Sequence, residues 1–326
     1  MTKNFNDNEF DQNLNFCKFK IPQNYGRVIW EVTNECNYGC KYCIFSSTGR
    51  KPLGELDTLK IIETLHSLYS QNFRYIKFTG GEPFLRLDMI DILKTAVKIG
   101  FKCDISTNAS KITDDIANKI SNINLEFIHV SVDGHTQEIH ESVRGKKSFY
   151  PTIEGLKKLK SYSAKLRIGC VLHSQNEHFI KEMSYYFKQL GVDEVIFSIM
   201  ENVGRMKGKT TGLAVQSPDI LAEIIDSICI SNLKISHNLK SLIQPVQFNL
   251  NTHFKVTCPG ADRFLFINSL GVVSPCTWVS ERAPQYIGES LHHKSLSDIL
   301  ISNTFEDFKE FKKTSGPVCP METIKK

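Results

Sequence analysis

The stretch "GRVIWEVTNECNYGCKYC", residues 26–43, joins an apolar run to three cysteines separated by three and then two residues. The β-branched and aromatic residues of its first half predict a strand over residues 26–33. The cysteines therefore follow directly on a strand end. A structural zinc site takes four protein ligands, but this loop offers three Cys and no His. Either a distant fourth ligand completes the site or one coordination position stays open.

Strand-like and helix-like segments alternate along the next 170 residues. Apolar residues at helical spacing predict helices over residues 57–72, 87–100, 113–122, 149–163 and 178–191, and strand-like runs lie between them at 74–81, 101–108, 125–134, 165–173 and 193–200. We expect Asp57 to cap the first helix and Gly100 to end the second. Six such β-then-α units require parallel strands joined by right-handed crossovers. The fold class is therefore α/β, a partial (β/α)6 barrel similar to a TIM barrel but open on one side.

Polar motifs follow the predicted strands in turn. The cysteines follow the first strand, "TGGEP" (79–83) the second, "STN" (106–108) the third and "SVDG" (131–134) the fourth. The loops at the carboxyl ends of barrel strands carry the chemistry in barrels of this type. Within "TGGEP", two glycines let the backbone approach a ligand closely, and Glu82 offers an acceptor to a cationic amine.

A second group of cysteines lies beyond the barrel. The run "DRFLFINSLGVVSPCTW" (262–278) predicts a β-hairpin turning at Asn268–Gly271, flanked by Cys258 and Cys276, with Cys319 near the end. We predict a polar leader over 1–25, the barrel over 26–215, a linking helical segment over 216–250 that includes a helix at 218–232, and a small cysteine-containing module over 251–326.

Composition excludes several classes of protein. The formal charge of +5 is mild and the basic residues are mixed with acids, which argues against nucleic-acid binding. No apolar run of about 18 residues predicts a membrane span, and the first residues lack the pattern of a signal peptide. We therefore expect a cytoplasmic protein. In that reducing compartment, clustered cysteines are metal or redox ligands rather than a disulfide framework.

The CxxxCxxC spacing after the first strand of a partial barrel resembles the radical S-adenosylmethionine (radical SAM) superfamily. The resemblance implies that Cys36, Cys40 and Cys43 bind three irons of a 4Fe–4S cluster, while the amino and carboxylate groups of S-adenosylmethionine chelate the fourth iron. It also places Tyr42 near the adenine. A zinc knuckle or plain buried thiols are the alternatives for these cysteines.

The same resemblance supplies a pocket for S-adenosylmethionine. It implies that the glycine-rich motif binds the methionyl amine and that polar residues at the next strand ends reach the ribose or the carboxylate, with Arg144 suited to a carboxylate. The predicted pocket residues are Gly80, Gly81, Glu82, Pro83, Ser106, Asn108, Ser131 and Arg144. Asp133 belongs either to this pocket or to a turn before Gly134.

The C-terminal cysteines resemble those of SPASM and twitch domains, which follow the barrel in the auxiliary-cluster branch of that superfamily. The resemblance implies that Cys258, Cys276 and Cys319 hold a second 4Fe–4S cluster with three protein ligands. Full SPASM domains carry more cysteines, so a module that has lost its cluster is the alternative.

The remaining cysteines, Cys17, Cys103, Cys170 and Cys229, are interpreted as small buried hydrophobes. Cys170 lies in the middle of a strand, and a second hypothesis has it face the barrel interior and donate a hydrogen atom to a substrate radical. His135 and His140 look like surface residues.

The functional hypothesis is an oxidoreductase or maturase that takes one electron from a donor such as flavodoxin or ferredoxin. The resemblance implies cleavage of S-adenosylmethionine to a 5′-deoxyadenosyl radical, which abstracts hydrogen from the substrate. We expect a peptide or protein substrate, as in the modification of ribosomally made peptides. A small molecule, such as a sugar, nucleotide or cofactor precursor, is the alternative. A non-catalytic iron–sulfur or zinc protein is the remaining hypothesis from another class.

Overall fold

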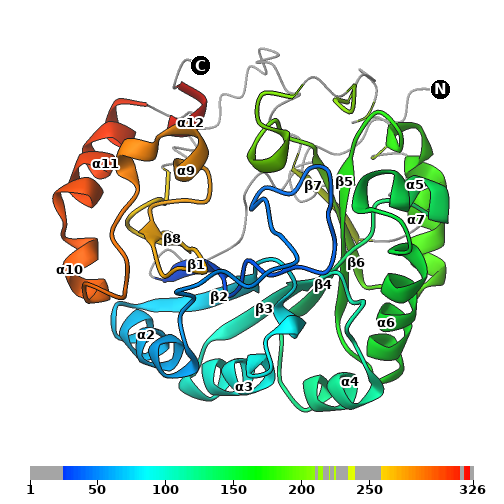
Figure 1. Ribbon diagram of the computed structural model, residues 1–326, viewed down its shortest axis with the longest axis horizontal. Coiled ribbons are helices and arrows are strands. Elements are labelled where there is room, and N and C mark those ends of the chain that lie inside the picture. The colour runs from blue at the N-terminus through cyan, green and yellow to red at the C-terminus, as the bar shows by residue number, and fades with distance from the viewer. Residues whose placement is uncertain are drawn as a thin grey trace, which may run out of the picture.

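The strands of the protein form one curved sheet (Figure 1). The computed structural model describes residues 25–209, 212–215, 220, 224, 234–238, 258–315 and 319–323. Within them the sheet has nine strands in the order β7-β6-β5-β4-β3-β2-β1-β8-β9. The strands are β1 (Gly26–Glu31), β2 (Phe73–Thr79), β3 (Lys102–Thr107), β4 (Phe127–Ser131), β5 (Leu166–Leu172), β6 (Glu194–Ile199), β7 (Lys234–Asn238), β8 (Phe264–Ile267) and β9 (Val273–Ser274). Neighbours from β7 to β8 pair in parallel, so the predicted α/β barrel with an open side is confirmed.

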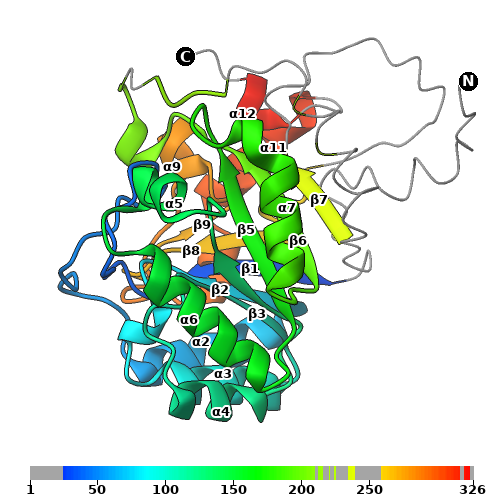
Figure 2. The same cartoon turned by 90° about the vertical axis from the view of Figure 1, so that its right-hand side faces the viewer.

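Helices cover the outer, convex face of this sheet (Figures 1 and 2). They are α2 (Thr58–Ser70), α3 (Met89–Ile99), α4 (Asp114–Ser121), α6 (Phe149–Ser161) and α7 (Ile180–Gln189). The short helix α5 (Gln137–Arg144) lies instead at the carboxyl end of the strands, where Val143 O accepts from the N–H of Lys41. Three 3-10 turns are η1 (Pro83–Leu85), η2 (Glu177–Phe179) and η3 (Gly204–Met206). The C-terminal elements α9 (Val279–Arg282), η4 (Pro284–Tyr286), α10 (Leu296–Leu300), α11 (Asn303–Thr314) and α12 (Pro320–Thr323) gather beside β8.

Local signals set the helix ends. Asp57 accepts a hydrogen bond from the backbone N–H of Lys60 at 2.8 Å, so the predicted cap of α2 is confirmed. Gly100 ends α3 with φ 114°, in the left-handed region that favours glycine, as predicted. These ends fix where each helix returns the chain to the next strand.

Strand residues alternate between an apolar outer face and a polar inner face. On β1, Val28 and Trp30 are buried in the core beneath the helices, whereas Arg27 and Glu31 point into the barrel. The same alternation puts Cys170 on the outer face of β5, where its Sγ lies 4.0 Å from Sδ of Met183 on α7. The hypothesis that Cys170 faces the barrel interior is therefore wrong.

The interior of the barrel holds a network of buried charged and polar side chains. His129 Nε2 lies 3.4 Å from Asp104 Oδ2 and 3.2 Å from Arg167 Nη1, and Lys77 Nζ lies 3.4 Å from His129 Nδ1. Burial, reinforced by the charge of Lys77, lowers the pKa of His129 to about 3, so the imidazole is neutral. Burial likewise lowers the pKa of Lys77 to about 8. These side chains link β2, β3, β4 and β5 from within.

The C-terminal module continues the barrel sheet. The predicted hairpin is confirmed as β8 and β9 with its turn at 268–272, and Arg27 to Trp30 of β1 pair with Phe264 to Ile267 of β8. The sequence did not predict this pairing, nor β7. The domain boundaries themselves remain predictions.

Several expectations fall outside the described residues. They are the leader through residue 24 with Cys17, most of the helix at 218–232 with Cys229, and the segment 239–257. Among the helices that the structure describes, none is long and apolar enough to cross a membrane.

Candidate active site

The first three cysteines meet in the loop that follows β1. Cys36 is buried, and Cys40 and Cys43 are half-buried. Burial is the main cause that raises the pKa of the Cys36 thiol to about 12, and the nearby Glu82, Cys40 and Cys43 contribute to this rise, because negative charges there would repel one on Cys36. The backbone N–H of Tyr38 lies 3.4 Å from Cys36 Sγ. The loop therefore brings the three predicted ligands together.

Arg205 holds this loop from η3. Its guanidinium donates to the carbonyl oxygens of Cys40 and Ser47, and its backbone N–H donates to Cys43 O at 3.0 Å. Gly204 adopts φ 56°, and a Cβ there would lie 2.5 Å from Cys43 O. Glycine is needed at this point of close contact, which fastens the segment after β6 to the cysteine loop.

The donor set of this loop fits an iron–sulfur cluster. Among the described residues, no three His, Cys, Asp or Glu side chains converge on a point where one metal ion would sit. A 4Fe–4S cube needs no such convergence, because each thiolate binds a different iron. Nitrogen donors also lie near the sulfurs, with Asn108 Nδ2 4.0 Å from Cys36 Sγ and Arg144 Nη1 4.0 Å from Cys40 Sγ. Hydrogen bonds to cluster ligands tune reduction potential.

The glycines of "TGGEP" permit a close approach of backbone to backbone. Gly80 has φ 146°, and a Cβ there would lie 2.2 Å from Thr33 O, while a Cβ on Gly81 would lie 2.0 Å from Glu35 O. The N–H of Gly81 donates to Thr33 O at 2.7 Å. The motif is thus packed against residues 33–35, the segment that leads into Cys36. Glycine at these positions therefore allows close packing against the cysteine loop, and the predicted contact with a ligand stays a prediction.

Replacing Gly81 by alanine is expected to displace that segment. The new methyl group must push Glu35 O away, which costs about 3 kcal/mol of unfolding free energy by analogy with overpacked cores. Gly39→Ala is the matched control in the cysteine loop, because its Cβ would meet nothing within 4 Å. Denaturant unfolding and iron content measure both effects. Equal stability and iron content in the two variants would refute this role for Gly81.

Glu82 ties two strand ends together. Its carboxylate is fully buried and accepts from the N–H of Phe84 at 3.1 Å, the hydroxyl of Thr107 at 2.7 Å and the N–H of Asn108 at 2.7 Å. Burial outweighs these hydrogen bonds and raises the pKa of Glu82 to about 7. The carboxylate therefore binds the loop after β2 to the loop after β3. Its predicted contact with an amine stays a prediction.

Asp133 is the centre of a buried network above β4. Its Oδ2 accepts from the hydroxyl of Tyr42 and from Arg144 Nε at 2.6 Å, and its Oδ1 accepts from the N–H of Val171 at 2.8 Å. Burial alone would raise the pKa of Asp133, but the guanidinium of Arg144 holds it below its usual value. Asp133 is thus more than a turn residue. His140 Nδ1 accepts from the Asp133 N–H at 3.3 Å and His140 is fully buried, so its expected surface position is wrong.

The other predicted pocket residues surround this network. Arg144 bridges Asp133 and the sulfur of Cys40, and the ring of Tyr42 packs in a small apolar cluster with Val143. Strand alternation puts half-buried Ser106 and Ser131 on the inner faces of β3 and β4. Pro83 begins η1 and is buried. The predicted residues therefore lie along the carboxyl ends of β2, β3 and β4, beside the cysteine loop.

The three cysteines of the second set also lie near one another. Cys258 precedes β8, Cys276 follows β9 and Cys319 precedes α12. Burial is the main cause that raises the pKa of Cys276 to about 12, and the nearby thiols of Cys258 and Cys319 contribute to this rise. The backbone N–H of Trp278 lies 3.3 Å from Cys276 Sγ, which repeats the relation of Tyr38 to Cys36. All eight cysteines that the structure describes are free thiols.

Comparison with known families finds two domains in the chain. The profile of the radical SAM superfamily matches residues 30–185, and that of the SPASM iron–sulfur cluster-binding domain matches residues 258–321. The chain belongs to the radical SAM superfamily. It is a radical SAM enzyme of the auxiliary-cluster branch, and its cofactors are 4Fe–4S clusters and S-adenosylmethionine.

Relatives of this radical SAM enzyme have several activities. An AdoMet-dependent heme synthase of Methanosarcina barkeri is 24% identical over 316 residues, which cover 91% of this chain and 89% of the relative. Mycofactocin maturase MftC of Mycobacterium tuberculosis is 30% identical over 167 residues, which cover 50% of this chain and 42% of the relative.

Solved structures share the fold. SuiB of Streptococcus suis bound to S-adenosylmethionine superposes with a TM-score of 0.73 at 16% identity, covering 88% of this chain and 68% of SuiB. The protein anSMEcpe with bound AdoMet gives a TM-score of 0.66 at 18% identity, covering 86% and 82% of the two chains.

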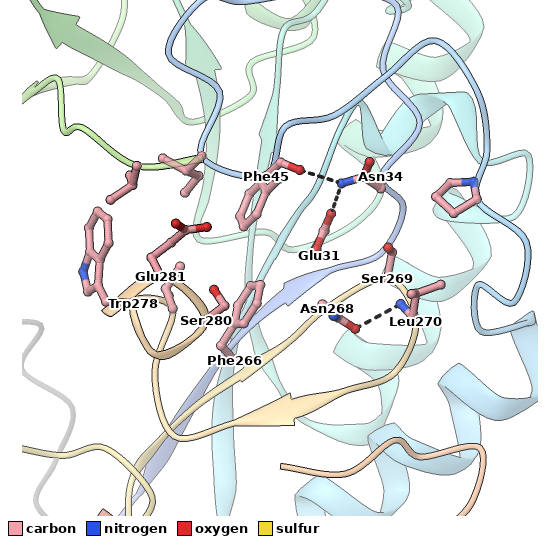
Figure 3. A pocket seen from close by; sticks show the side chains of 14 residues that line it. Glu31, Asn34, Phe45, Phe266, Asn268, Ser269, Leu270, Trp278, Ser280 and Glu281 are labelled. Atoms are coloured by element: carbon pink, nitrogen blue, oxygen red, sulfur yellow. Dashed lines mark hydrogen bonds between the residues drawn. The ribbon is translucent and has the colours of Figure 1, made fainter. Parts of the chain in front are cut away.

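A pocket of about 320 Å³ lies between the loops that carry the two cysteine sets (Figure 3). Ile44 and Phe45, directly after Cys43, form part of its wall, and Thr277 and Trp278, directly after Cys276, form another part. The remaining lining residues are Glu31, Asn34, Pro52, Val203, Phe266, Asn268, Ser269, Leu270, Ser280 and Glu281. In the radical SAM enzyme this is a chamber of ligand size beside both predicted cluster sites.

Glu31 makes this pocket sensitive to pH. Its carboxylate accepts from Asn34 Nδ2 at 2.6 Å and from the backbone N–H of Ser269. Burial is the main cause that raises the pKa of Glu31 from 4.5 to about 7, and the charge of Glu55 adds to it. The folded protein therefore holds the Glu31 proton more tightly than the unfolded chain does.

The stability of the protein should follow this titration. Ionising Glu31 is less favourable in the folded state than in the unfolded chain. The free energy of unfolding should therefore fall by up to about 3 kcal/mol as pH rises from about 4.5 through about 7. Glu82 carries a similar shift, so the contribution of Glu31 is the difference between wild type and Glu31→Gln. Denaturant unfolding along a pH series measures it. Parallel pH profiles for the two proteins would contradict the assignment.

Sequence reasoning left the role of Asp133 open between the pocket and a turn, and missed the roles of Arg205 and Glu31. Charged residues inside strand-like runs, such as the glutamate of "GRVIWEVT", were the available signal, because a charge in a buried strand must find a partner. The partners themselves come from segments far away in the chain.

Proposed function

We propose that Cys36, Cys40 and Cys43 hold the 4Fe–4S cluster that binds S-adenosylmethionine, and that the substrate is a peptide or protein. The meeting of three thiols beside the polar ends of β2, β3 and β4 supports the first part. When bound, the cluster and S-adenosylmethionine supply a carbon radical that takes a hydrogen atom from a C–H bond of the substrate. The chain then has to orient both molecules and exclude water.

Different residues of the chain would bind and orient S-adenosylmethionine. Backbone groups of Gly80 and Gly81, with Asn108, Ser106 and Ser131, line the side where S-adenosylmethionine would lie. Arg144 presents its guanidinium to the methionyl carboxylate while Asp133 keeps it in place at 2.6 Å. Glu82 and Pro83 set the motif loop, and the ring of Tyr42 closes the pocket.

The C-terminal cysteines are proposed to hold the auxiliary cluster. Cys258, Cys276 and Cys319 give three thiolates, and Lys312 Nζ donates to Cys258 O at 3.1 Å, which steadies the first of them from α11. Three thiolates leave one iron without a protein ligand from this set. The pocket between the two sites is where a substrate would meet both.

Peptide substrates are supported by several relatives. MftC is named a mycofactocin maturase, SuiB has been solved bound to precursor peptide SuiA, and anSMEcpe has been solved with a Cp18Cys peptide. The heme synthase similarity, which extends over 91% of the chain, favours a small cofactor precursor as the second candidate. We place the enzyme in the cytoplasm, where its thiols stay reduced and a flavodoxin or ferredoxin can deliver the electron.

Transfer of deuterium distinguishes the two substrate classes. The neighbouring genes are searched for a short open reading frame, and the deuterated peptide that such a frame encodes is incubated anaerobically with the reconstituted enzyme, dithionite and S-adenosylmethionine. We expect deuterium in the 5′-deoxyadenosine and a changed mass of the peptide. Deuterium transfer from a labelled cofactor precursor, with none from the peptide, would assign the enzyme to the small-molecule class.

A further inference from the structure

The pocket between the two cysteine sets has acidic and aromatic walls. Of the described residues that line it, Glu31 and Glu281 are charged, and both are acids. Figure 3 shows their carboxylates on either side of Phe45. The rings of Phe45 and Phe266 stack 5.8 Å apart with an angle of 1° between their planes. Trp278 adds a third aromatic surface. The pocket thus combines apolar walls with acceptors at two ends.

Each carboxylate has capacity left for a donor. Glu31 is 4% exposed and accepts from two neutral groups, Asn34 Nδ2 and the Ser269 N–H. A carboxylate has about four lone-pair positions. No cation is among the main influences on its charge, whereas Glu55 adds negative potential. A positive group that entered the pocket would therefore offset the cost of burying the charge of Glu31 and the repulsion between Glu31 and Glu55.

Glu281 shows which kind of group the pocket accepts. Its Oε2 forms an ion pair with Lys207 Nζ at 3.2 Å, so an ammonium already fits against it. The Lys207 side chain is 64% exposed, and ion pairs of such exposed lysines contribute little to the stability of the folded protein. Arg282, a neighbouring cation, is paired with Glu201 at 2.8 Å and lies against Trp278. Lys207 is thus a replaceable occupant of the acidic end.

We propose that this pocket binds a lysine or arginine side chain of the substrate, with its aliphatic stem between the aromatic walls and its charged head at Glu31 and Glu281. The inference rests on the proposed peptide function and names the residue that is recognised. A volume of about 320 Å³ accommodates one long side chain rather than a folded peptide. Long basic side chains place apolar stems on apolar surface while their heads reach polar groups.

Two side-chain analogues test the proposal on the full, cluster-loaded protein. Nα-acetyl-lysine N-methylamide carries the charge, and Nα-acetyl-norleucine N-methylamide has the same stem without it. Anaerobic calorimetric titration measures both dissociation constants. We expect the lysine analogue to bind at least about tenfold more tightly. Equal constants, or no saturable binding of the lysine analogue, would overturn the proposal.

Charge-neutralising variants show whether Glu31 and Glu281 produce the preference for the lysine analogue. Glu281→Gln and Glu31→Gln should each reduce the lysine preference by about tenfold and leave norleucine binding unchanged. Glu281 is partly exposed, so its variant should fold even if Glu31→Gln does not. Glu310→Gln, on an exposed face of α11, removes the same charge and should keep the preference. Retention of the preference in Glu281→Gln, or its loss in Glu310→Gln, would refute the assignment.

Cleavage of S-adenosylmethionine by wild type, measured without either analogue, reports separately on the proposed function. A preparation that cleaves it but shows no lysine preference refutes the pocket assignment alone. A preparation that prefers lysine but never cleaves S-adenosylmethionine refutes the proposed cluster site alone.

Discussion

Replacing Cys40 by alanine is expected to abolish cleavage of S-adenosylmethionine and to remove about half of the bound iron. Each 4Fe–4S cluster holds four irons, so two filled sites give about eight per chain. Cys40 is one of three thiolates at the first site and lies beside Arg144, so its loss leaves a cluster held at two corners. Iron analysis and the yield of 5′-deoxyadenosine measure the result.

Two other cysteine variants complete this experiment. Cys276→Ala should remove the other half of the iron, because Cys276 belongs to the second set. Cys103→Ala is the matched control, since Cys103 is fully buried in β3 among core side chains. It should keep all the iron and the activity. Full iron content in Cys40→Ala, or iron loss in Cys103→Ala, would show that the cluster ligands are assigned wrongly.

Replacing Asp133 by asparagine should destabilise the protein by about 3–5 kcal/mol. The substitution leaves the buried guanidinium of Arg144 without its anion, and breaking a buried ion pair from one side carries a cost of that size. It also places an amide where Tyr42 and Arg144 both donate to one oxygen. Unfolding by denaturant measures the change.

A double-mutant cycle isolates the ion pair from other effects. Arg144→Met together with Asp133→Asn should cost less than the sum of the two single variants, because no uncompensated charge remains in the double variant. The Nε–Oδ2 distance of 2.6 Å within a buried site predicts strong coupling. Additive single and double effects would contradict the account of Asp133 as the anchor of Arg144.

Periodic features of the sequence were sufficient to predict most of the fold. The six predicted barrel strands correspond to β1–β6, because apolar positions repeat every two residues in strands and every three or four in helices. The two cysteine sets were also visible, since metal ligands are recognised by residue type and spacing. The structure brings each set together.

Long-range contacts could not be predicted in the same way. Nothing local in residues 264–267 specifies pairing with β1, and the partner of a buried side chain such as Asp133 comes from another loop. The glycines of "TGGEP" were interpreted as letting the backbone approach a ligand, and the structure adds a role that the sequence did not predict, their close packing against Thr33 and Glu35. The interpretation of Cys170 as a small buried hydrophobe is confirmed. Only the second hypothesis, that it faces the barrel interior, is wrong, because the face of a strand residue depends on strand register, which the sequence leaves open.

Anaerobic reconstitution with iron and sulfide, followed by dithionite and S-adenosylmethionine, tests the central claim most directly. The wild-type chain should bind about eight irons and release 5′-deoxyadenosine and methionine only when the reductant is present. A chain that binds zinc in place of iron, or binds iron but releases no 5′-deoxyadenosine, would contradict the claim that Cys36, Cys40 and Cys43 hold the cluster that binds S-adenosylmethionine.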